Sequence, residues 1–220
     1  MSGATANARR RSQGRSAPAA RRSRARAGRR RLAILVALVV GIAAALLLAA
    51  RGPVDDAILE IRLPLRHEDV IRQQARDKDL DPALIAAVCY QESKFQDRTS
   101  HAGARGVMQL LPSTADYIAR KSGGTQFVHG DLADPQINIA YGSWYLRYLL
   151  AHYDGSERLA IAAYNAGETN VDRWVAAAGG PDEFTADEDI PFAETREYVA
   201  SVEEKQDQYR DNYAHELGIH

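Results

Sequence analysis

The residue best suited to acid–base chemistry is Glu92, near the end of residues 81–95, DPALIAAVCYQESKF. Asp81 can cap a helix start, Pro82 suits its first turn, and every residue from 83 to 89 is apolar. A helix that is apolar all round belongs inside a protein. It would bring Glu92 to the edge of an apolar body, where desolvation raises the pKa of a carboxyl group and lets it donate a proton near neutral pH. The alternative is a helix that simply surfaces there, with Glu92 solvated.

Polar residues also stand where core residues are expected in two later segments. Residues 103–112, GARGVMQLLP, pass from a glycine-containing loop into an apolar stretch that contains Gln109. Glycines let a backbone approach a ligand closely, and the amide of Gln109 offers a donor and an acceptor suited to a sugar hydroxyl or acetamido group. Tyr164 and Asn165 end a short apolar helix before Gly167, and a tyrosine brings both a ring and a hydroxyl to a carbohydrate site. Taken alone, each segment is better explained as an ordinary loop or helix end.

The elements that must position these residues are predicted to be helices. From residue 67 onward no run alternates apolar and polar residues convincingly enough to indicate a strand. Capping residues, prolines and glycines mark the expected boundaries. We expect an amphipathic helix with Val70, Ile71, Ala75 and Leu80 on its apolar face, the apolar helix at 81–95, and helices at about 112–121, 134–155, 156–163, 169–178 and 191–217, with a loop at 99–106.

The N-terminal part of the chain has a different composition. Residues 1–31 contain eleven arginines and almost nothing apolar, and we expect a disordered cytoplasmic tail. Residues 32–50, LAILVALVVGIAAALLLAA, form an uninterrupted apolar run, and about 20 such residues span a bilayer core. The arginines that precede this run predict that the N-terminus lies in the cytoplasm and that the folded domain after the run lies outside the cytoplasmic membrane. Residues 51–66 are expected to be a juxtamembrane linker.

Two interpretations of residues 32–50 compete. One is a retained transmembrane signal anchor, and the other is a cleaved signal peptide with a long basic front, which would release the body as a secreted protein. The apolar run is longer than most signal-peptide cores, which favours the anchor. Arg30 and Arg31 before the run also faintly resemble a twin-arginine export signal. In each version the body works outside the cytoplasmic membrane.

Charge and cysteine content exclude several classes of function. Residues 1–54 contain 12 of the 28 Lys and Arg residues and no Asp or Glu. Residues 55–220 therefore contain the other 16 together with all 29 acidic residues, which gives them a net charge of −13. Such an acidic body argues against nucleic acid as a partner of the folded domain. The one cysteine, Cys89, excludes an intrachain disulfide and is expected to be a small core residue. Since the histidines are scattered and no H-E-x-x-H, phosphate-loop or G-x-S-x-G motif occurs, we expect no metal and no cofactor.

Five blocks of sequence together carry a family resemblance. YQESKF, SHAGARGVMQLLPSTA, DPQINIAYGSWYL, AIAAYNAG and IPFAETREYV occur in the order and approximate spacing of the catalytic domain of the soluble lytic transglycosylase family. The resemblance covers roughly residues 67–210. It implies a mainly α, lysozyme-like catalytic domain at 67–217, preceded here by the single predicted transmembrane helix. It also implies a bacterial enzyme that cuts the β-1,4 bond between N-acetylmuramic acid and N-acetylglucosamine in peptidoglycan glycan strands.

The resemblance assigns roles to individual residues. The glutamate–serine pair of the family falls on Glu92 and Ser93, which makes Glu92 the catalytic acid. The substrate-binding positions fall on Ser100, Met108, Gln109, Tyr164, Asn165 and Glu194, the last of which matches a pocket carboxylate. This sequence departs little from the family pattern. Val107 stands where leucine is commoner, and Cys89 stands where the family usually has an aliphatic residue.

Glu92 has no equally supported carboxylate partner in the sequence. A usual glycosidase needs two carboxylates, and nothing fixes nearby Asp97 toward Glu92. One acid–base group suffices if no water is added, because the C6 hydroxyl of muramic acid can attack C1 and leave a 1,6-anhydromuramyl end. The alternatives are a hydrolytic muramidase similar to goose-type lysozyme and a noncatalytic wall-binding module. The sequence does not specify an oligomeric state.

Overall fold

The computed structural model describes residues 35–42, 57–124 and 126–219, and the chain divides into two compact units, residues 1–58 and 59–220. In the first unit, residues 35–42 are helical and exposed. Within the described residues, no helix combines the length and the apolar character needed to cross a membrane. The predicted tail at 1–31, residues 32–34 and 43–50 of the predicted anchor, and residues 51–56 of the predicted linker lie outside the described residues.

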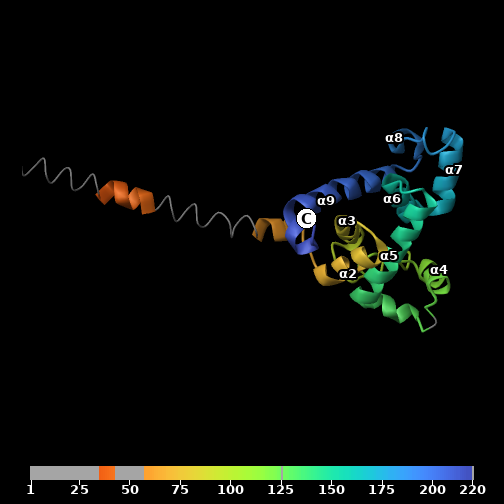
Figure 1. The fold of residues 1–220 in the computed structure, drawn as a ribbon, viewed down its shortest axis with the longest axis horizontal. Helices are drawn as coiled ribbons and strands as arrows, with labels where there is room; N and C mark the ends of the chain where they lie inside the picture. The colour runs from red at the N-terminus through yellow and green to blue at the C-terminus, as the bar shows by residue number, and fades with distance from the viewer. Residues whose placement is uncertain (1–34, 43–56, 125, 220) are drawn as a thin grey trace, which may run out of the picture. The chain divides into compact units, whose positions relative to one another are not determined.

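The second unit is mainly helical, as the sequence predicts (Figure 1). Its elements are α2 (Glu68–Lys78), α3 (Pro82–Ser93), α4 (Pro112–Ser122), the 3-10 helix η1 (His129–Ala133), α5 (Pro135–His152), α6 (Glu157–Ala166), α7 (Glu168–Ala178), α8 (Ala186–Asp189) and α9 (Ala193–Leu217). In the described part of this unit, extended backbone pairs only as isolated bridges that join Arg105 to Thr99 and to Leu110. The prediction missed η1 and α8, which are too short to show a helical period.

The predicted helix starts are confirmed by side-chain caps. Asp81 accepts a hydrogen bond from the backbone N–H of Ala83 at 2.8 Å, and Asp134 accepts one from Gln136 at 2.8 Å. These bonds satisfy backbone donors that have no partner inside the helix. Helix α7 begins at Glu168, slightly earlier than expected, because the glycine between α6 and α7 ends one helix and starts the next.

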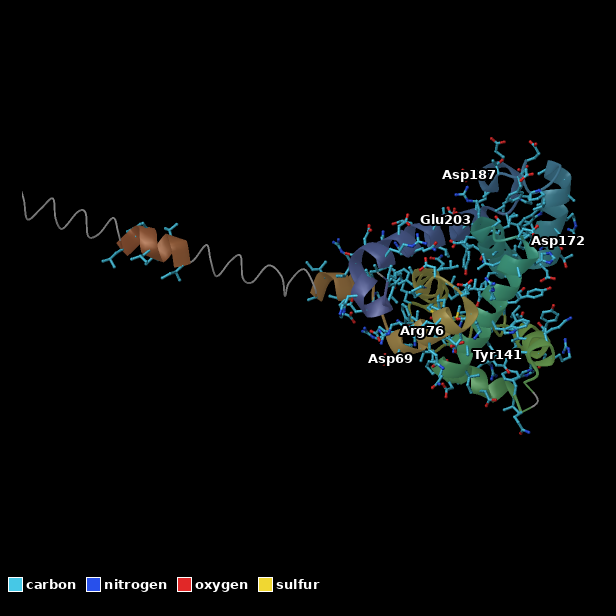
Figure 2. All side chains as sticks on the ribbon, in the orientation of Figure 1. Asp69, Arg76, Tyr141, Asp172, Asp187 and Glu203 are labelled. Atoms are coloured by element: carbon cyan, nitrogen blue, oxygen red, sulfur yellow. The ribbon has the colours of Figure 1, made fainter. Side chains whose placement is uncertain are left out.

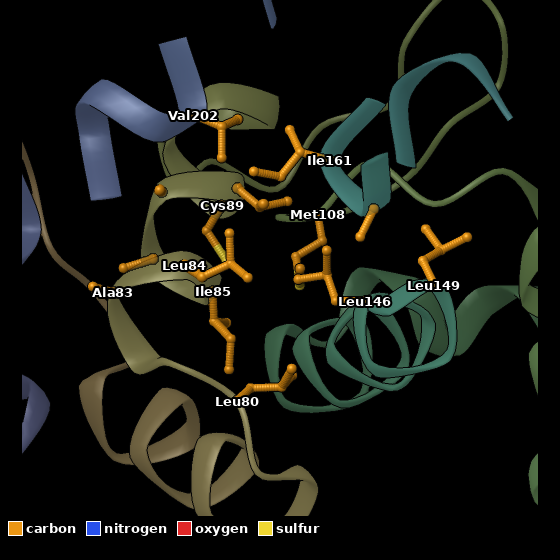
Figure 3. Close-up of a cluster of buried hydrophobic side chains, with 14 of the residues drawn as sticks. Leu80, Ala83, Leu84, Ile85, Cys89, Met108, Leu146, Leu149, Ile161 and Val202 are labelled. Atoms are coloured by element: carbon orange, nitrogen blue, oxygen red, sulfur yellow. The ribbon is translucent and has the colours of Figure 1, made fainter. Parts of the chain in front are cut away.

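Helix α3 lies at the centre of the main hydrophobic core. All residues from 83 to 89 are buried, as the apolar run predicts. Figure 3 shows Leu84, Ile85 and Cys89 of α3 opposite Met108 and Leu146. Cys89 is confirmed as a core residue, and burial raises the pKa of its thiol far above the ordinary value. Of the described helix pairs, α3 and α9 share the most extensive contact.

The start of α3 is tied to the middle of α9. Gln206 is buried and donates from its amide nitrogen to Asp81 at 2.8 Å and to Glu157 of α6 at 3.1 Å. Arg210, one turn further along α9, donates from Nε to the same oxygen of Asp81 at 3.0 Å. The carboxylate of Asp81, at the edge of the core, therefore has hydrogen-bond partners for its charge.

A second, smaller hydrophobic cluster lies beside the main one. Its buried members are Leu110, Ala115, Ile118 and Leu132, from the loop after α3, from α4 and from η1. Tyr145 of α5 and Tyr164 of α6 pack against both clusters. These two tyrosines therefore mark the seam between the clusters.

Candidate active site

Glu92 is a half-buried residue in the last turn of α3. Tyr198 of α9 donates its hydroxyl to Oε1 of Glu92 at 2.7 Å. Burial raises the pKa of Glu92 from 4.5 to about 7, although the Tyr198 hydrogen bond and the charge of Arg98 both act to lower it. Near neutral pH the carboxyl group is therefore present in both protonation states, so it can give or take a proton.

Tyr198 is a site residue that the sequence reasoning missed. It lies four residues after Glu194, one helical turn away on α9, within the IPFAETREYV block. Burial and the nearby charge of Glu92 raise the pKa of the Tyr198 hydroxyl well above its ordinary value. The hydroxyl thus keeps its proton and remains a donor to Glu92.

The loop that follows α3 is attached to the end of the helix. Ser93 is buried and donates its hydroxyl to the backbone oxygen of Val107 at 2.6 Å. Arg98 donates from Nη2 to the backbone oxygen of Glu92 at 2.6 Å, which satisfies a carbonyl at the helix C-terminus. Ser93 and Arg98 therefore fix the backbone at the catalytic candidate and directly after it.

Ser100 and Gln109 both use side-chain atoms to shape this loop. Oγ of Ser100 accepts a hydrogen bond from the N–H of Ala104 at 3.0 Å. Gln109 has a φ of 46°, and its amide nitrogen donates to the backbone oxygens of Arg98 at 2.9 Å and Gly106 at 2.8 Å. The amide nitrogen is thus occupied inside the loop, so a sugar contact by Gln109 would use its amide oxygen.

Met108 is placed in the core, where its side chain cannot reach a sugar. The residue is fully buried, and its side chain lies against Gly142 of α5. Its backbone N–H donates to Oδ1 of Asn138 at 2.7 Å, and its backbone oxygen accepts the hydroxyl of Tyr164 at 2.9 Å. Met108 therefore positions the loop, in place of the substrate contact that the resemblance implied for its side chain.

Asn138 is a second residue that sequence reasoning missed. It is fully buried on α5, and besides accepting from Met108 it donates to the backbone oxygens of Arg105 at 2.9 Å and Leu132 at 3.1 Å. One amide thus joins the loop, η1 and α5. A buried amide with every group satisfied holds such a junction rigidly. Its place in the DPQINIAYG block is the signal that could have identified it.

Asn165 and Glu194 lie where α6 meets the start of α9. Oδ1 of Asn165 accepts the hydroxyl of Thr195 at 2.7 Å, so two of the sequence blocks meet here. Thr195 is buried, whereas Glu194 is exposed in the first turn of α9. The structure therefore brings Asn165 to Thr195 and places the Glu194 carboxylate in solvent, one turn before Tyr198.

The charges around Glu92 are few. In the part of the chain that the structure describes, the groups that shift the pKa of Glu92 are Tyr198 and Arg98, and neither is a carboxylate. Among those residues no group of three or more His, Cys, Asp or Glu side chains is arranged to hold a metal ion. Glu92 is thus the carboxyl group of the described site that can give and take a proton near neutral pH.

Comparison with known proteins gives consistent matches. The family model of the transglycosylase SLT domain matches residues 69–186. The soluble lytic murein transglycosylase of Salmonella typhimurium is 36% identical over 147 residues, 66% of this chain and 23% of that protein. The membrane-bound lytic murein transglycosylase F of Pseudomonas fluorescens is 34% identical over 121 residues, 52% of this chain and 23% of that protein.

A solved structure agrees with these matches. The 70-kDa soluble lytic transglycosylase of Escherichia coli superposes with a TM-score of 0.66 at 32% identity, over 73% of this chain and 26% of that one. The chain therefore spans about a quarter of the length of the relatives that it matches.

Proposed function

Because this chain belongs to the transglycosylase SLT domain family, we propose that it is a peptidoglycan lytic transglycosylase in which Glu92 is both the acid and the base. The observation that carries the proposal is the state of Glu92. Burial raises its pKa to about 7, Tyr198 holds its Oε1, and none of the groups that shift this pKa in the described residues is a carboxylate. A two-carboxylate hydrolase would need a second such group beside it.

The reaction follows from one carboxyl group used twice. Protonated Glu92 donates its proton to the glycosidic oxygen, and the bond from that oxygen to C1 of N-acetylmuramic acid breaks. The acetamido group of the same sugar relieves the positive charge that develops at C1. Glu92, now a carboxylate, takes the proton of the C6 hydroxyl as O6 bonds to C1. The products are a 1,6-anhydromuramyl end and a free N-acetylglucosamine hydroxyl, and Glu92 is again protonated.

The surrounding residues prepare this carboxyl group. Tyr198 orients Oε1, so the other carboxyl oxygen can face the glycosidic bond. Asn138 and Tyr164 hold the backbone at Met108 on the neighbouring loop. We expect the sugar contacts to come from groups around this frame: Ser100, Gln109 through its amide oxygen, Asn165, and Glu194 as an exposed carboxylate.

The proposal is tested by the products of digestion. Purified peptidoglycan is treated with the full chain in detergent, beside the Glu92→Gln variant, and the products are analysed by mass spectrometry. We expect anhydromuramyl products with the wild-type chain and none with the variant, whose circular dichroism should match the wild type. Products of equal amount from the variant would remove Glu92 from its role.

The same experiment separates the alternatives. Products heavier by one water would identify a hydrolytic muramidase and direct the search to the residue that positions that water. Binding to peptidoglycan without any product from the wild-type chain would identify a wall-binding module.

We also propose that residues 32–50 are a retained anchor that holds the catalytic domain outside the cytoplasmic membrane. The proposal is supported by the apolar run, by the eleven arginines that precede it and by the name of the membrane-bound relative. Peptidoglycan would then be reached from the membrane. Intact mass measurement on the protein extracted from membranes is expected to include residues 1–31. A soluble product that begins after residue 50 would show that the segment is a cleaved signal peptide.

A further inference from the structure

A short stretch before α2, residues 62–65, is held to the domain by tyrosine hydroxyls, and we call it the strap. Three tyrosines of α3 and α9 donate to three consecutive backbone oxygens of the strap. The bonds run from Tyr90 to Arg62 at 3.0 Å, from Tyr213 to Leu63 at 2.8 Å and from Tyr209 to Pro64 at 2.6 Å. Figure 1 shows this stretch running beside the C-terminal part of α9 toward α2.

The side chains of the strap are part of the main hydrophobic core. Leu63 and Leu65 are only 3% and 2% exposed. The strap falls within residues 51–66, for which the sequence predicts a linker, and it precedes residues 69–186, which the family model matches. A free linker would leave its side chains and carbonyls to solvent, whereas these are buried or hydrogen-bonded. The strap is therefore attached to the catalytic domain from outside the matched part of the sequence.

Tyr209 connects the strap to the end of α3. It is fully buried, and burial raises the pKa of its hydroxyl far above the ordinary value, so the hydroxyl remains a donor to Pro64. Its ring meets Phe95 edge-on at 6.3 Å and Tyr90 edge-on at 6.4 Å. Tyr90 precedes Glu92 by two residues, and Phe95 follows it by three. The ring that the strap holds thus contacts the chain on both sides of the catalytic candidate.

The turn that follows Glu92 needs such support because its backbone is strained. Lys94 and Phe95 have φ values of 53° and 62°, and neither is a glycine. A left-handed conformation at residues with side chains persists only where the surrounding structure holds it. The Phe95 side chain is buried, and its contact with Tyr209 is part of that support. The direction in which α3 ends, and with it the place of Glu92, therefore depends on this contact.

The strap reaches Glu92 through these side chains and not by moving α9. The helix carries Tyr198 near its start and Tyr209 in its second half. Between them lies Glu203, labelled in Figure 2, which accepts a hydrogen bond from Nε of Arg158 on α6 at 2.8 Å. This ion pair and the bonds made by Gln206 hold the middle of α9 in place. A local change at the strap is therefore passed on by the contact between Tyr209 and Phe95.

We propose that the strap is a positioning segment of the active site: it fixes Tyr209, and Tyr209 holds the turn at Phe95 that places the Glu92 carboxyl group against Tyr198. The consequence for catalysis rests on the proposed function, whereas the effect on the position of Glu92 does not. An acid must be held precisely against the bond that it cleaves, and a small misplacement is costly in rate.

The most specific test is Tyr209→Phe, which keeps the ring and removes only the hydroxyl that bonds to Pro64. The pKa of Glu92 is measured in the full chain in detergent by NMR of its side-chain carboxyl carbon, which is assigned with Glu92→Gln. Because a looser turn weakens the hydrogen bond from Tyr198, we expect the pKa of Glu92 to rise in this variant. With peptidoglycan, kcat should fall by about tenfold while KM stays within about twofold.

Three further variants separate positioning from stability. The matched control is Tyr153→Phe, which removes the hydroxyl that another buried tyrosine donates to Asp172 at 3.1 Å. It should lose a similar amount of thermal stability and leave the pKa of Glu92 and kcat unchanged. Leu65→Ala loosens the strap without removing the Tyr209 hydroxyl and should shift the pKa in the same direction as Tyr209→Phe. In a Phe95→Leu background, Tyr209→Phe should shift the pKa by less than about half as much, because the ring contact is already lost.

Each outcome bears on the strap separately from the reaction. A Glu92 pKa that is the same as in the wild type in both Tyr209→Phe and Leu65→Ala would overturn the proposal, as would an equal shift in the Tyr153→Phe control. A full effect of Tyr209→Phe in the Phe95→Leu background would overturn the route through Phe95. A shifted pKa together with no anhydromuramyl products from the wild-type chain would support the strap and reject the proposed function. Circular dichroism and thermal unfolding of each variant confirm that it is folded.

Discussion

Tyr198 and Glu92 are joined by a 2.7 Å hydrogen bond although 106 residues separate them in the chain. The bond acts against the larger effect of burial, which raises the pKa of Glu92 to about 7. The pKa of Glu92 is thus set by two opposed effects: burial raises it, and the hydrogen bond from Tyr198 lowers it. Removing either one should move the pKa in a defined direction.

The first prediction concerns the pH dependence of activity. If protonated Glu92 starts the reaction, kcat/KM should fall as the pH rises through about 7, because the acid form is lost. Tyr198→Phe removes a donor that stabilises the carboxylate, so the pKa should rise and the fall should move to higher pH. The measurement is the rate of peptidoglycan solubilisation across the neutral range. A profile unchanged by the substitution would mean that Tyr198 does not act on the titrating group.

The second prediction concerns stability. Glu92 has a folded-state pKa of about 7 against an ordinary value of 4.5, so the unfolded chain loses this proton first as the pH rises. Its contribution to the free energy of unfolding is therefore largest below pH 4.5, declines between 4.5 and 7, and is constant above. Glu92→Gln removes the decline and should be more stable than the wild type above pH 7 by roughly 1–3 kcal/mol. Urea unfolding at low and high pH tests this, and equal differences at both would contradict it.

The third prediction concerns Asn138. Asn138→Ala leaves the N–H of Met108 and the backbone oxygens of Arg105 and Leu132 without their partner. Two buried groups and one partly buried group lose hydrogen bonds, so the free energy of unfolding should fall by about 3–5 kcal/mol. The matched control is Asn170→Ala, whose amide makes one bond, to the backbone oxygen of Ala166 at the end of α6, and should cost about 1 kcal/mol or less. Similar losses for both variants in urea unfolding would argue against the junction at Asn138.

The fourth prediction concerns the contact between Gly142 and Met108. A Cβ atom at Gly142 would lie 2.3 Å from the sulfur of Met108, so Gly142→Ala must displace that side chain. Overpacking of this kind costs about 1–3 kcal/mol, and activity should fall because the loop borders Glu92. Gly130→Ala is the control, since nothing lies within 4 Å of the added atom there. The readouts are thermal unfolding and product formation, and no change in either for Gly142→Ala would contradict the prediction.

The sequence predicts the elements that depend on local pattern. The apolar run from 83 to 89 and the caps at Asp81 and Asp134 are local features, and the structure confirms them. The raised pKa expected for Glu92 follows from the same run, because an apolar helix desolvates the group at its end.

The residues that were missed or misassigned depend on contacts between distant segments. Tyr198 and Asn138 meet their partners only after α9 and α5 have packed, so the sequence blocks that contain them do not reveal those partners. Met108 was assigned to the substrate because its block matches a substrate-binding motif, whereas packing against α5 decides which side chain of that block faces the core. The positive φ of Gln109 turns its amide under the loop, and a single sequence does not reveal that turn.

Both ends of α3 are hydrogen-bonded to α9, and this also determines when the site can form. Asp81 is held by Gln206 and Arg210, and Glu92 is held by Tyr198. During synthesis, residues 81–92 leave the ribosome long before any of those partners exist. A nascent chain thus carries the glutamate without the burial that makes it an acid. On the proposed function, catalytic competence is therefore expected only after α9 has been translated and has docked on α3.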